Sequence, residues 1–183
     1  MNKKHMRKGF SLVELIVVLF IIVILASIVG VAWNNIIFRT RVRTSNSAAK
    51  VIFNAAQNEV IRINQEERLD PDHGYMGKGD FYIYWNGRTG GFSKTDDGKT
   101  EASFSAGSNN LERGKTNRLI GAINKVAGTS GIYKIWIRNY TVQSVAYVPN
   151  ASSNYLGTYP KQQENPSSGA DPKALHQTMA DIS

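Results

Sequence analysis

The chain of 183 residues contains no cysteine, three histidines and five prolines. The lack of cysteine excludes a disulfide-stapled scaffold, a thiolate metal site and a cysteine nucleophile. His5, His73 and His176 all lie outside any motif with a nucleophile. Hydrolytic catalysis needs a nucleophile with an oriented base, or paired carboxylates. We therefore expect a protein that is not an enzyme and that binds no cofactor.

Acidic residues are absent from residues 1–9, where four basic residues supply half of the formal net charge of +8. Residues 15–33 lack charge of either sign and are apolar except for Ser27 and Gly30. As a helix this run would span ~28 Å, about the hydrocarbon thickness of a bilayer. Trp33 ends the run, where amphipathic aromatic residues favour the membrane interface. The sequence therefore predicts a membrane-inserted helix.

Three interpretations of this N-terminal segment are open from the residues alone. A secretory signal peptide has an apolar core of ~7–15 residues followed by a small-x-small cleavage site. This run is longer, and no convincing site of that kind follows it. A plain signal anchor fits the length and the basic start. The third interpretation depends on Glu14, because an ionisable residue at the membrane edge is costly and is by default a functional hypothesis.

Glu14 itself has two interpretations. If the chain were cut after Gly9, Phe10 would expose a new α-amine, with a reference pKa of ~7.7–8.0. Its positive charge would pair with Glu14, most naturally that of a neighbouring subunit. Alternatively, Glu14 marks the polar start of the helix, where the macrodipole tolerates an acid.

The basic leader and the apolar run are joined by the stretch Lys8-Gly9-Phe10-Ser11-Leu12-Val13-Glu14-Leu15. Together these features resemble the class III signal of type IV pilins and pseudopilins. The resemblance implies that a membrane-embedded prepilin peptidase cleaves after Gly9 on the cytoplasmic side and methylates the new N-terminal Phe10. It also implies that Glu14 is the glutamate used in assembly.

The resemblance implies a prepilin-like structural subunit of a type IV pilus-type filament, polymerised through its N-terminal helix. The implied partners are other pilin subunits, the prepilin peptidase/methyltransferase, an inner assembly platform and membrane lipid. Two alternatives stay open. A pseudopilin of a type II secretion-like or DNA-uptake machine carries the same signal, and a single-pass anchored ligand-binding domain would not polymerise.

The implied location is the cytoplasmic membrane, with the C-terminal domain outside, and after assembly a cell-surface filament. Many Gram-negative major pilins close their C-terminal region with a disulfide, so the lack of cysteine favours a Gram-positive source or a minor subunit. Arg39, Arg41 and Arg43 follow the apolar run. They would contact anionic lipid headgroups or acids of a neighbouring subunit, although we favour a solvated helix face.

No proline before Pro71 forces a helix to end. Apolar residues in the second part of this segment recur at three- and four-residue steps, which is typical of an amphipathic helix. They are Ala48, Ile52, Ala55, Ala56, Val60 and Ile63. Charged residues lie largely off this stripe, namely Lys50, Glu59, Arg62 and Glu66. We predict one helix from about Phe10 to about Arg68, with possible kinks at Gly30 and Ser45–Ser47.

After residue 70 the pattern changes to strands. The alternation in DFYIYW, residues 80–85, places Phe81, Ile83 and Trp85 on one side of a half-buried strand. Further strands are expected at 91–93, 102–104, 132–138 and 141–148, and a short helix at 116–127, capped by Thr116. The result is an antiparallel sheet that buries one face against the second half of the long helix.

Three other clusters suggest chemistry, and each has a structural alternative that we favour. Asp70-Pro71-Asp72-His73-Gly74 has metal-binding residue types but matches turn chemistry better, so we expect no metal. Gly114-Lys115-Thr116 resembles the end of a P-loop but lacks its first glycine. A basic-aromatic face for nucleic acid or polysaccharide would comprise Tyr82, Tyr84, Arg88 and Arg138, against sheet packing with scattered surface charge.

The predicted fold class is α+β, with a long N-terminal helix packed on a small antiparallel β-sheet in a pilin-like arrangement. Five segments are expected: a cytoplasmic leader (1–9), a transmembrane assembly helix (10–33), the amphipathic half of the helix (34–69), a globular antiparallel-sheet region (70–149) and a polar, mostly disordered tail (150–183). Within the tail, residues 155–160 are the candidate for docking on the sheet edge.

Overall fold

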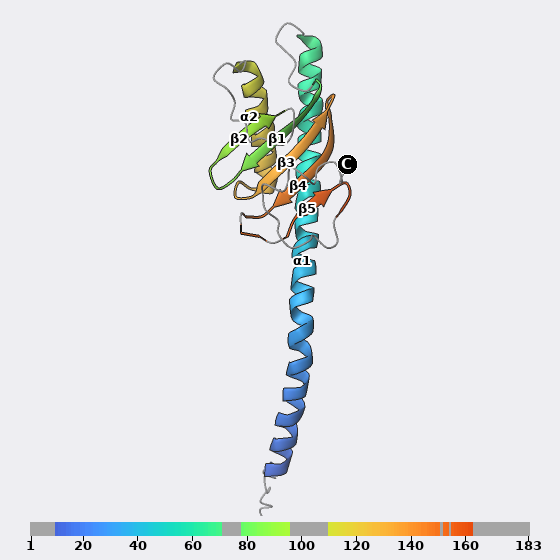
Figure 1. The fold of residues 1–183 in the computed structure, drawn as a ribbon, viewed down its shortest axis with the longest axis vertical. Helices are drawn as coiled ribbons and strands as arrows, with labels where there is room; N and C mark the ends of the chain where they lie inside the picture. The colour runs from blue at the N-terminus through green and yellow to red at the C-terminus, as the bar shows by residue number, and fades with distance from the viewer. Residues whose placement is uncertain (1–9, 71–77, 96–109, 151, 154, 163–183) are drawn as a thin grey trace, which may run out of the picture. The chain divides into compact units, whose positions relative to one another are not determined.

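The computed structural model of the chain describes residues 10–70, 78–95, 110–150, 152–153 and 155–162, without the side chains of 28–32, 93, 95 and 110–112. The chain divides into two compact units, Met1–Phe38 and Arg39–Ser183, which are treated separately below. Figure 1 shows the elements in the order α1 (Leu12–Leu69), β1 (Asp80–Asn86), β2 (Gly91–Thr95), α2 (Asn110–Ala127), β3 (Ile132–Arg138), β4 (Thr141–Val148) and β5 (Gly157–Tyr159).

α1 is 58 residues long and confirms the single N-terminal helix predicted from the sequence. It continues through Gly30 and Ser45–Ser47, the two positions at which a kink was possible. Its last turn contains Arg68, and a cation there interacts favourably with the helix C-terminus. Asp70 directly precedes Pro71, and a residue before proline disfavours helical geometry, which explains why the helix ends here.

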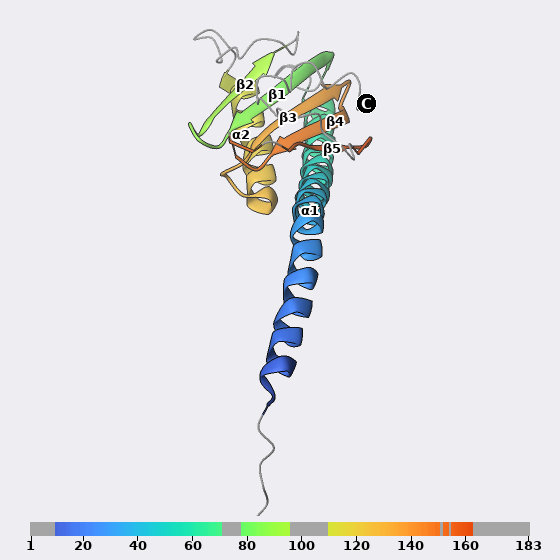
Figure 2. The same cartoon turned by 60° about the horizontal axis from the view of Figure 1, so that its bottom comes forward.

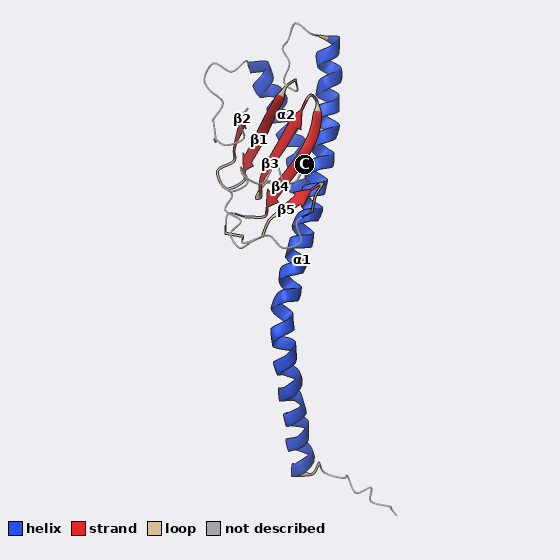
Figure 3. Ribbon diagram, turned by 45° about the vertical axis from the view of Figure 1, so that its right-hand side comes forward, coloured by secondary structure: helices blue, strands red, loops and turns tan. Residues whose placement is uncertain are grey.

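The strands form one antiparallel sheet in the order β2-β1-β3-β4-β5 (Figure 3). β1 and β3 are separated in sequence by β2 and α2, yet they pair over seven residue pairs. Asn139 and Tyr140 connect β3 to β4, and both have positive φ, as the two central residues of a tight hairpin turn require. The predicted α+β fold is therefore confirmed.

The strand predictions agree closely with the observed elements. β3 and β4 coincide with the predicted strands, β1 extends one residue further to Asn86, and β2 contains residues 91–93. The docking candidate at 155–160 forms β5, which adds to the edge of the sheet beside β4. The strand expected at 102–104 lies outside the described residues.

One face of the sheet is covered by α2 and the second half of α1 (Figure 2). The predicted amphipathic stripe of α1 is confirmed at its four most buried positions, Ile52, Ala56, Val60 and Ile63. Ala48 and Ala55 are only half-buried, and Ala49 takes the place of Ala48 as a fully buried residue. The sheet and α2 complete this core with Phe81, Ile83, Ile135, Ile137, Leu119 and Ile123.

The other face of the sheet also carries an apolar cluster, which the alternation predicted for β1 did not include. Tyr84 is only 6% exposed, although the alternation places it on the polar side of the strand. Its cluster contains Ile132, Trp136, Ala146, Val148 and Leu156. Leu156 belongs to the segment after β4, so this packing comes from a part of the chain that a local pattern cannot include.

The start of α2 differs from the prediction. The helix begins at Asn110, so Thr116 is an interior residue that is 0% exposed, and it is not the N-cap. Gly114-Lys115-Thr116 therefore lies within a helix, and not in a loop that curls around phosphate. The Lys115 Nζ donates to Glu67 Oε1 on α1 at 2.8 Å. Packing of α2 against α1 thus decides which of its residues are buried.

Glu59 was predicted to lie largely off the buried stripe, but it is 8% exposed. α2 covers this side of α1 and brings Arg118, whose Nε lies 3.0 Å from Glu59 Oε1. Arg62 of α1 also pairs with Glu59, at 2.7 Å. Burial raises the pKa of Glu59, but hydrogen bonds and positive charge from Arg62 and Arg118 outweigh it, so the net pKa lies below its ordinary value.

We expect the free energy of unfolding of the Glu59→Gln variant to be about 1 kcal/mol lower than that of the wild type at neutral pH. The pKa of this carboxyl is lower in the folded chain than in the unfolded chain, where it is ~4.3. Its stabilising effect is therefore complete above the unfolded-state pKa and is lost as the pH falls through the folded-state pKa. Denaturant unfolding of both chains from pH 7 to pH 3 should therefore show the difference shrinking below about pH 4. A difference that stays constant to pH 3 would contradict this origin of the stability.

β5 lies against the backbone of α1. The Thr158 amide donates to Asn46 Oδ1 at 2.8 Å in a buried contact. A Cβ atom built on Gly157 would lie 2.0 Å from the Ser45 carbonyl oxygen. Glycine is therefore needed at 157 because the two backbones approach too closely for any side chain.

Replacing Gly157 with alanine should lower the free energy of unfolding by about 2–3 kcal/mol, because backbone atoms on both sides must move apart. The matched control is Gly114→Ala in α2, where the new Cβ would meet no atom within 4 Å. This control should raise stability by about 0.5–1 kcal/mol, since alanine is the better helix former. Denaturant unfolding of the full chains in detergent measures both changes, and equal effects at 157 and 114 would refute the close contact.

Candidate assembly site at the N-terminus

The start of α1 is fixed by a reciprocal pair of side-chain hydrogen bonds. The Val13 amide donates to Ser11 Oγ at 3.4 Å, and the Ser11 amide donates to Glu14 Oε2 at 3.0 Å. The Leu15 amide donates to the Ser11 carbonyl at 3.2 Å, which closes the first helical turn. Ser11 is therefore the N-cap and Glu14 the N3 residue of a capping box.

Sequence reasoning did not assign Ser11 a role, although the signal was present. A serine followed three residues later by glutamate, just before an apolar run, is the sequence signature of a capping box. The helix-start interpretation of Glu14 is thus seen directly in the structure. It does not exclude the assembly role, because a carboxylate has acceptor sites beyond the single bond to Ser11.

The structure describes two of the three predicted site residues, Phe10 and Glu14. Phe10 is 83% exposed and lies one residue before the N-cap. Among the residues that the structure describes, none forms an ion pair with Glu14. Gly9, the expected cleavage position, lies outside the described residues. The charge of Glu14 is therefore available to a partner at the exposed start of the helix.

The large apolar side chains on both sides of Glu14 are all exposed in the single chain. From Leu12 to Leu25 each of them keeps 46–73% of its surface exposed. Contiguous apolar surface of this extent is rare on soluble monomers and marks a site of contact with protein or lipid. Within the described part of the chain, no helix is long and apolar enough to cross a membrane.

The other candidate clusters do not form sites among the described residues. No group of three or more His, Cys, Asp or Glu side chains in the described ranges is placed to hold a metal. Of the aspartate-histidine turn cluster, only Asp70 is described. These parts of the structure therefore provide no metal-binding arrangement.

The four candidates for a basic-aromatic face differ in their surroundings. Tyr84 is buried, whereas Arg88 is exposed in the turn after β1. Arg138 pairs with Asp80 at 2.7 Å and lies over the Trp136 ring, 4.7 Å from its centroid. The Trp136 ring also stacks on Tyr82, with 5.9 Å between the ring centroids, so Trp136 brings Tyr82 and Arg138 together.

Comparison with known protein families gives a match at the start of the chain. Residues 4–30 match the family model of the prokaryotic N-terminal methylation motif, and the match includes all three predicted site residues, Gly9, Phe10 and Glu14. A search of curated proteins and a search of solved structures each found no match. Proteins with this motif generally polymerise with other pilins and are processed by a prepilin peptidase. The motif is the class III signal of type IV pilins and pseudopilins, so the chain carries the N-terminal signal of a pilin-like or pseudopilin-like precursor.

Proposed function

We propose that this chain is a structural subunit of a type IV pilus-type filament. The chain is cleaved after Gly9, methylated at the new N-terminal Phe10 and polymerised through its N-terminal helix. One observation carries the proposal: every large apolar side chain from Leu12 to Leu25 is exposed within the segment that matches the methylation motif. A filament in which these helices pack against one another removes that surface from water.

The apolar segment holds the subunits in the filament once they have left the membrane, because neighbouring helices then take the place of lipid in keeping it away from water. Full burial of one large aliphatic side chain contributes about 1.5–3 kcal/mol. The loss of translational and rotational freedom on association costs an estimated 4–15 kcal/mol. Burial of several of these side chains therefore exceeds that cost, whereas a single contact does not.

Before assembly the same segment would lie in the cytoplasmic membrane. The uncharged run in the sequence covers residues 15–33, and it includes residues 28–32, whose side chains lie outside the description. Such a run matches the hydrocarbon thickness of a bilayer. We assign residues 1–9 to the cytoplasm because the peptidase signal lies there, and the C-terminal domain to the outside. The lack of cysteine fits a Gram-positive source or a minor subunit.

Glu14 would set the axial register of the filament. Cleavage after Gly9 creates an α-amine on Phe10, and this cation is the natural partner of a Glu14 carboxylate in a neighbouring subunit. Two opposite charges removed from water together are far less costly than one charge alone. Only the register that brings them together is then favoured, while apolar packing supplies most of the attraction.

Isolation of surface filaments tests the proposal. Filaments sheared from the cells that produce this chain should contain its processed form, and cells without the prepilin peptidase should keep the full-length chain in the membrane. A processed chain that stays in the membrane fraction and never enters filaments would contradict the proposal. That result would favour a pseudopilin of a secretion or DNA-uptake machine, or an anchored ligand-binding domain.

A further inference from the structure

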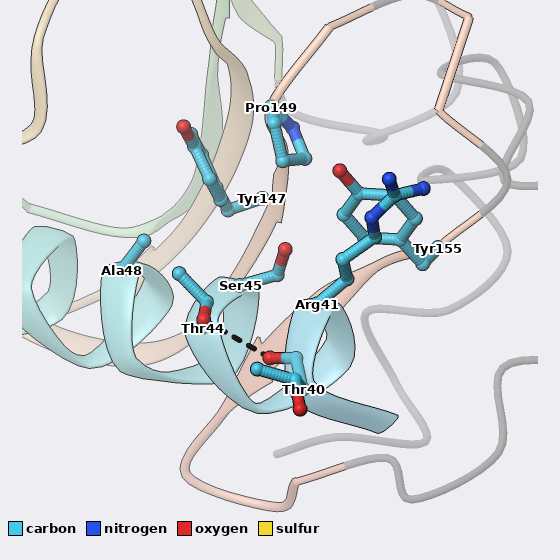
Figure 4. A pocket seen from close by; sticks show the side chains of 8 residues that line it. All are labelled: Thr40, Arg41, Thr44, Ser45, Ala48, Tyr147, Pro149 and Tyr155. Atoms are coloured by element: carbon cyan, nitrogen blue, oxygen red, sulfur yellow. Dashed lines mark hydrogen bonds between the residues drawn. The ribbon is translucent and has the colours of Figure 1, made fainter. Parts of the chain in front are cut away.

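A cavity of about 280 Å³ lies in the second unit, beside the middle of α1 (Figure 4). Residues of α1 form its floor, among them Arg41, Ser45 and Ala48. Tyr147 near the end of β4 and Tyr155 before β5 form its walls. The cavity is thus built by two segments that lie far apart in the sequence. Its volume is close to the lower end of the range for small-molecule sites, about 300 Å³.

Ser45 provides an unused polar group at the bottom of this cavity. The residue is 1% exposed, and its Oγ has no hydrogen-bond partner among the residues that the structure describes. Figure 4 shows the Ser45 hydroxyl pointing from α1 toward the side where Tyr147 and Tyr155 lie. A buried hydroxyl without a partner is unfavourable, so a ligand group that bonds to it in the cavity is favoured.

Arg41 supplies a positive charge at the same cavity. No described residue forms an ion pair with Arg41, and its side chain is exposed. None of the described residues that line the cavity is acidic. The hydroxyls of Ser45, Tyr147 and Tyr155 add further donors to the lining. The cavity is therefore suited to a ligand with a negative charge and several hydrogen-bonding groups.

The walls favour a ligand with a ring-shaped body. Tyr147 and Tyr155 present aromatic surface and Pro149 an aliphatic ring. The ring of Tyr147 has a fixed place because Gly131 leaves space for it: a Cβ atom on Gly131 would lie 2.3 Å from Tyr147 Cε2. Burial and then the proximity of Tyr155 raise the pKa of Tyr147, so it stays a neutral donor. A bare inorganic anion would leave this aromatic surface unused.

We propose that this cavity binds one acidic sugar residue, such as a uronic acid, from a surface polysaccharide. The carboxylate would pair with the Arg41 guanidinium, a ring hydroxyl would bond to Ser45 Oγ, and the sugar ring would pack on the tyrosines. This inference concerns a ligand of the second unit and is independent of cleavage, membrane insertion and polymerisation. The proposed sugar site differs from the basic-aromatic face considered from the sequence. None of that face's four residues lines the cavity, namely Tyr82, Tyr84, Arg88 and Arg138.

Ligand-observed NMR on the full chain in detergent tests the inference, with the methyl glycoside of glucuronic acid as the probe. We expect saturable binding that is weakened about tenfold or more by Arg41→Gln and by Ser45→Ala, since each removes one donor. The neutral methyl glucoside should bind about tenfold more weakly than the glucuronide, because it lacks the carboxylate. Arg43→Gln is the matched control, because Arg43 is an exposed arginine that does not line the cavity.

Three outcomes would overturn the inference. The first is no binding of the glucuronide to the wild-type chain. The second is equal binding of the glucuronide and the neutral glucoside, which would remove the role of Arg41. The third is binding of inorganic phosphate as tight as that of the glucuronide, which would show a simple anion site. Circular dichroism of Ser45→Ala and Arg41→Gln shows whether each variant is folded, and neither change removes the contact between Asn46 and Thr158.

Discussion

Replacing Glu14 with glutamine is expected to leave cleavage after Gly9 unchanged and to reduce incorporation into filaments about a hundredfold or more. The reason is the α-amine of Phe10, which in an assembled filament would be buried without its counter-charge. Removing one partner of a buried ion pair costs about 3–5 kcal/mol, which corresponds to this loss. The amount of the variant in sheared filaments, relative to its amount in whole cells, measures the effect.

Glutamine is the informative replacement because it keeps the helix start intact. Either glutamate or glutamine at N3 can accept the hydrogen bond from the N-cap amide, so Glu14→Gln preserves the bond to Ser11 and removes only the charge. Glu14→Ala removes both. If Glu14→Gln assembled normally and Glu14→Ala did not, the role of Glu14 would be capping, and the proposed register mechanism would be wrong.

Replacing Glu67 with glutamine is expected to lower the free energy of unfolding of the second unit by about 3 kcal/mol. The Glu67 side chain is 1% exposed and accepts hydrogen bonds from Lys115 Nζ at 2.8 Å and from the Tyr140 hydroxyl. It thereby joins α1 to α2 and to the turn between β3 and β4. Loss of its charge removes the carboxylate that lies 2.8 Å from the largely buried Lys115 ammonium, which is 14% exposed.

Glu66 offers a matched control one position away. Its side chain is 40% exposed, and it pairs with Arg118 at 2.6 Å and with Arg62 at 3.6 Å. Exposed pairs of this kind contribute about 0–1 kcal/mol, so Glu66→Gln should have a small effect. Denaturant unfolding followed by the fluorescence of Trp85 and Trp136, both at most 9% exposed, compares the variants. Equal losses for Glu66→Gln and Glu67→Gln would contradict the special role of the buried carboxylate.

The parts of the fold that the sequence predicted are those that depend on neighbouring residues. α1, β3 and β4 follow from periodic patterns and from the positions of proline and turn residues. The errors concern Thr116, Glu59 and Tyr84, each of which is buried by a segment distant in the sequence. Where α2 packs on α1, a local pattern cannot tell a cap from an interior residue or a surface carboxylate from a buried one.

The two candidate sites differ in the same way. Phe10 and Glu14 belong to one contiguous segment, so their spacing carries the signal and could be read directly. The cavity joins Arg41 and Ser45 to Tyr147 and Tyr155, and no sequence pattern connects these positions. Asn46 was visible only as a weak helix position, whereas in the structure its side chain holds β5 to α1.

The mass of the chain purified from the membrane or from filaments tests the central claim most directly. Intact-mass and N-terminal peptide mass spectrometry should find a chain that begins at Phe10 and carries one added methyl group on its α-amine. Cells without the prepilin peptidase should yield the unmethylated chain that begins at Met1. If the chain from peptidase-containing cells also begins at Met1, processing after Gly9 does not occur and the account of assembly through Phe10 and Glu14 is wrong.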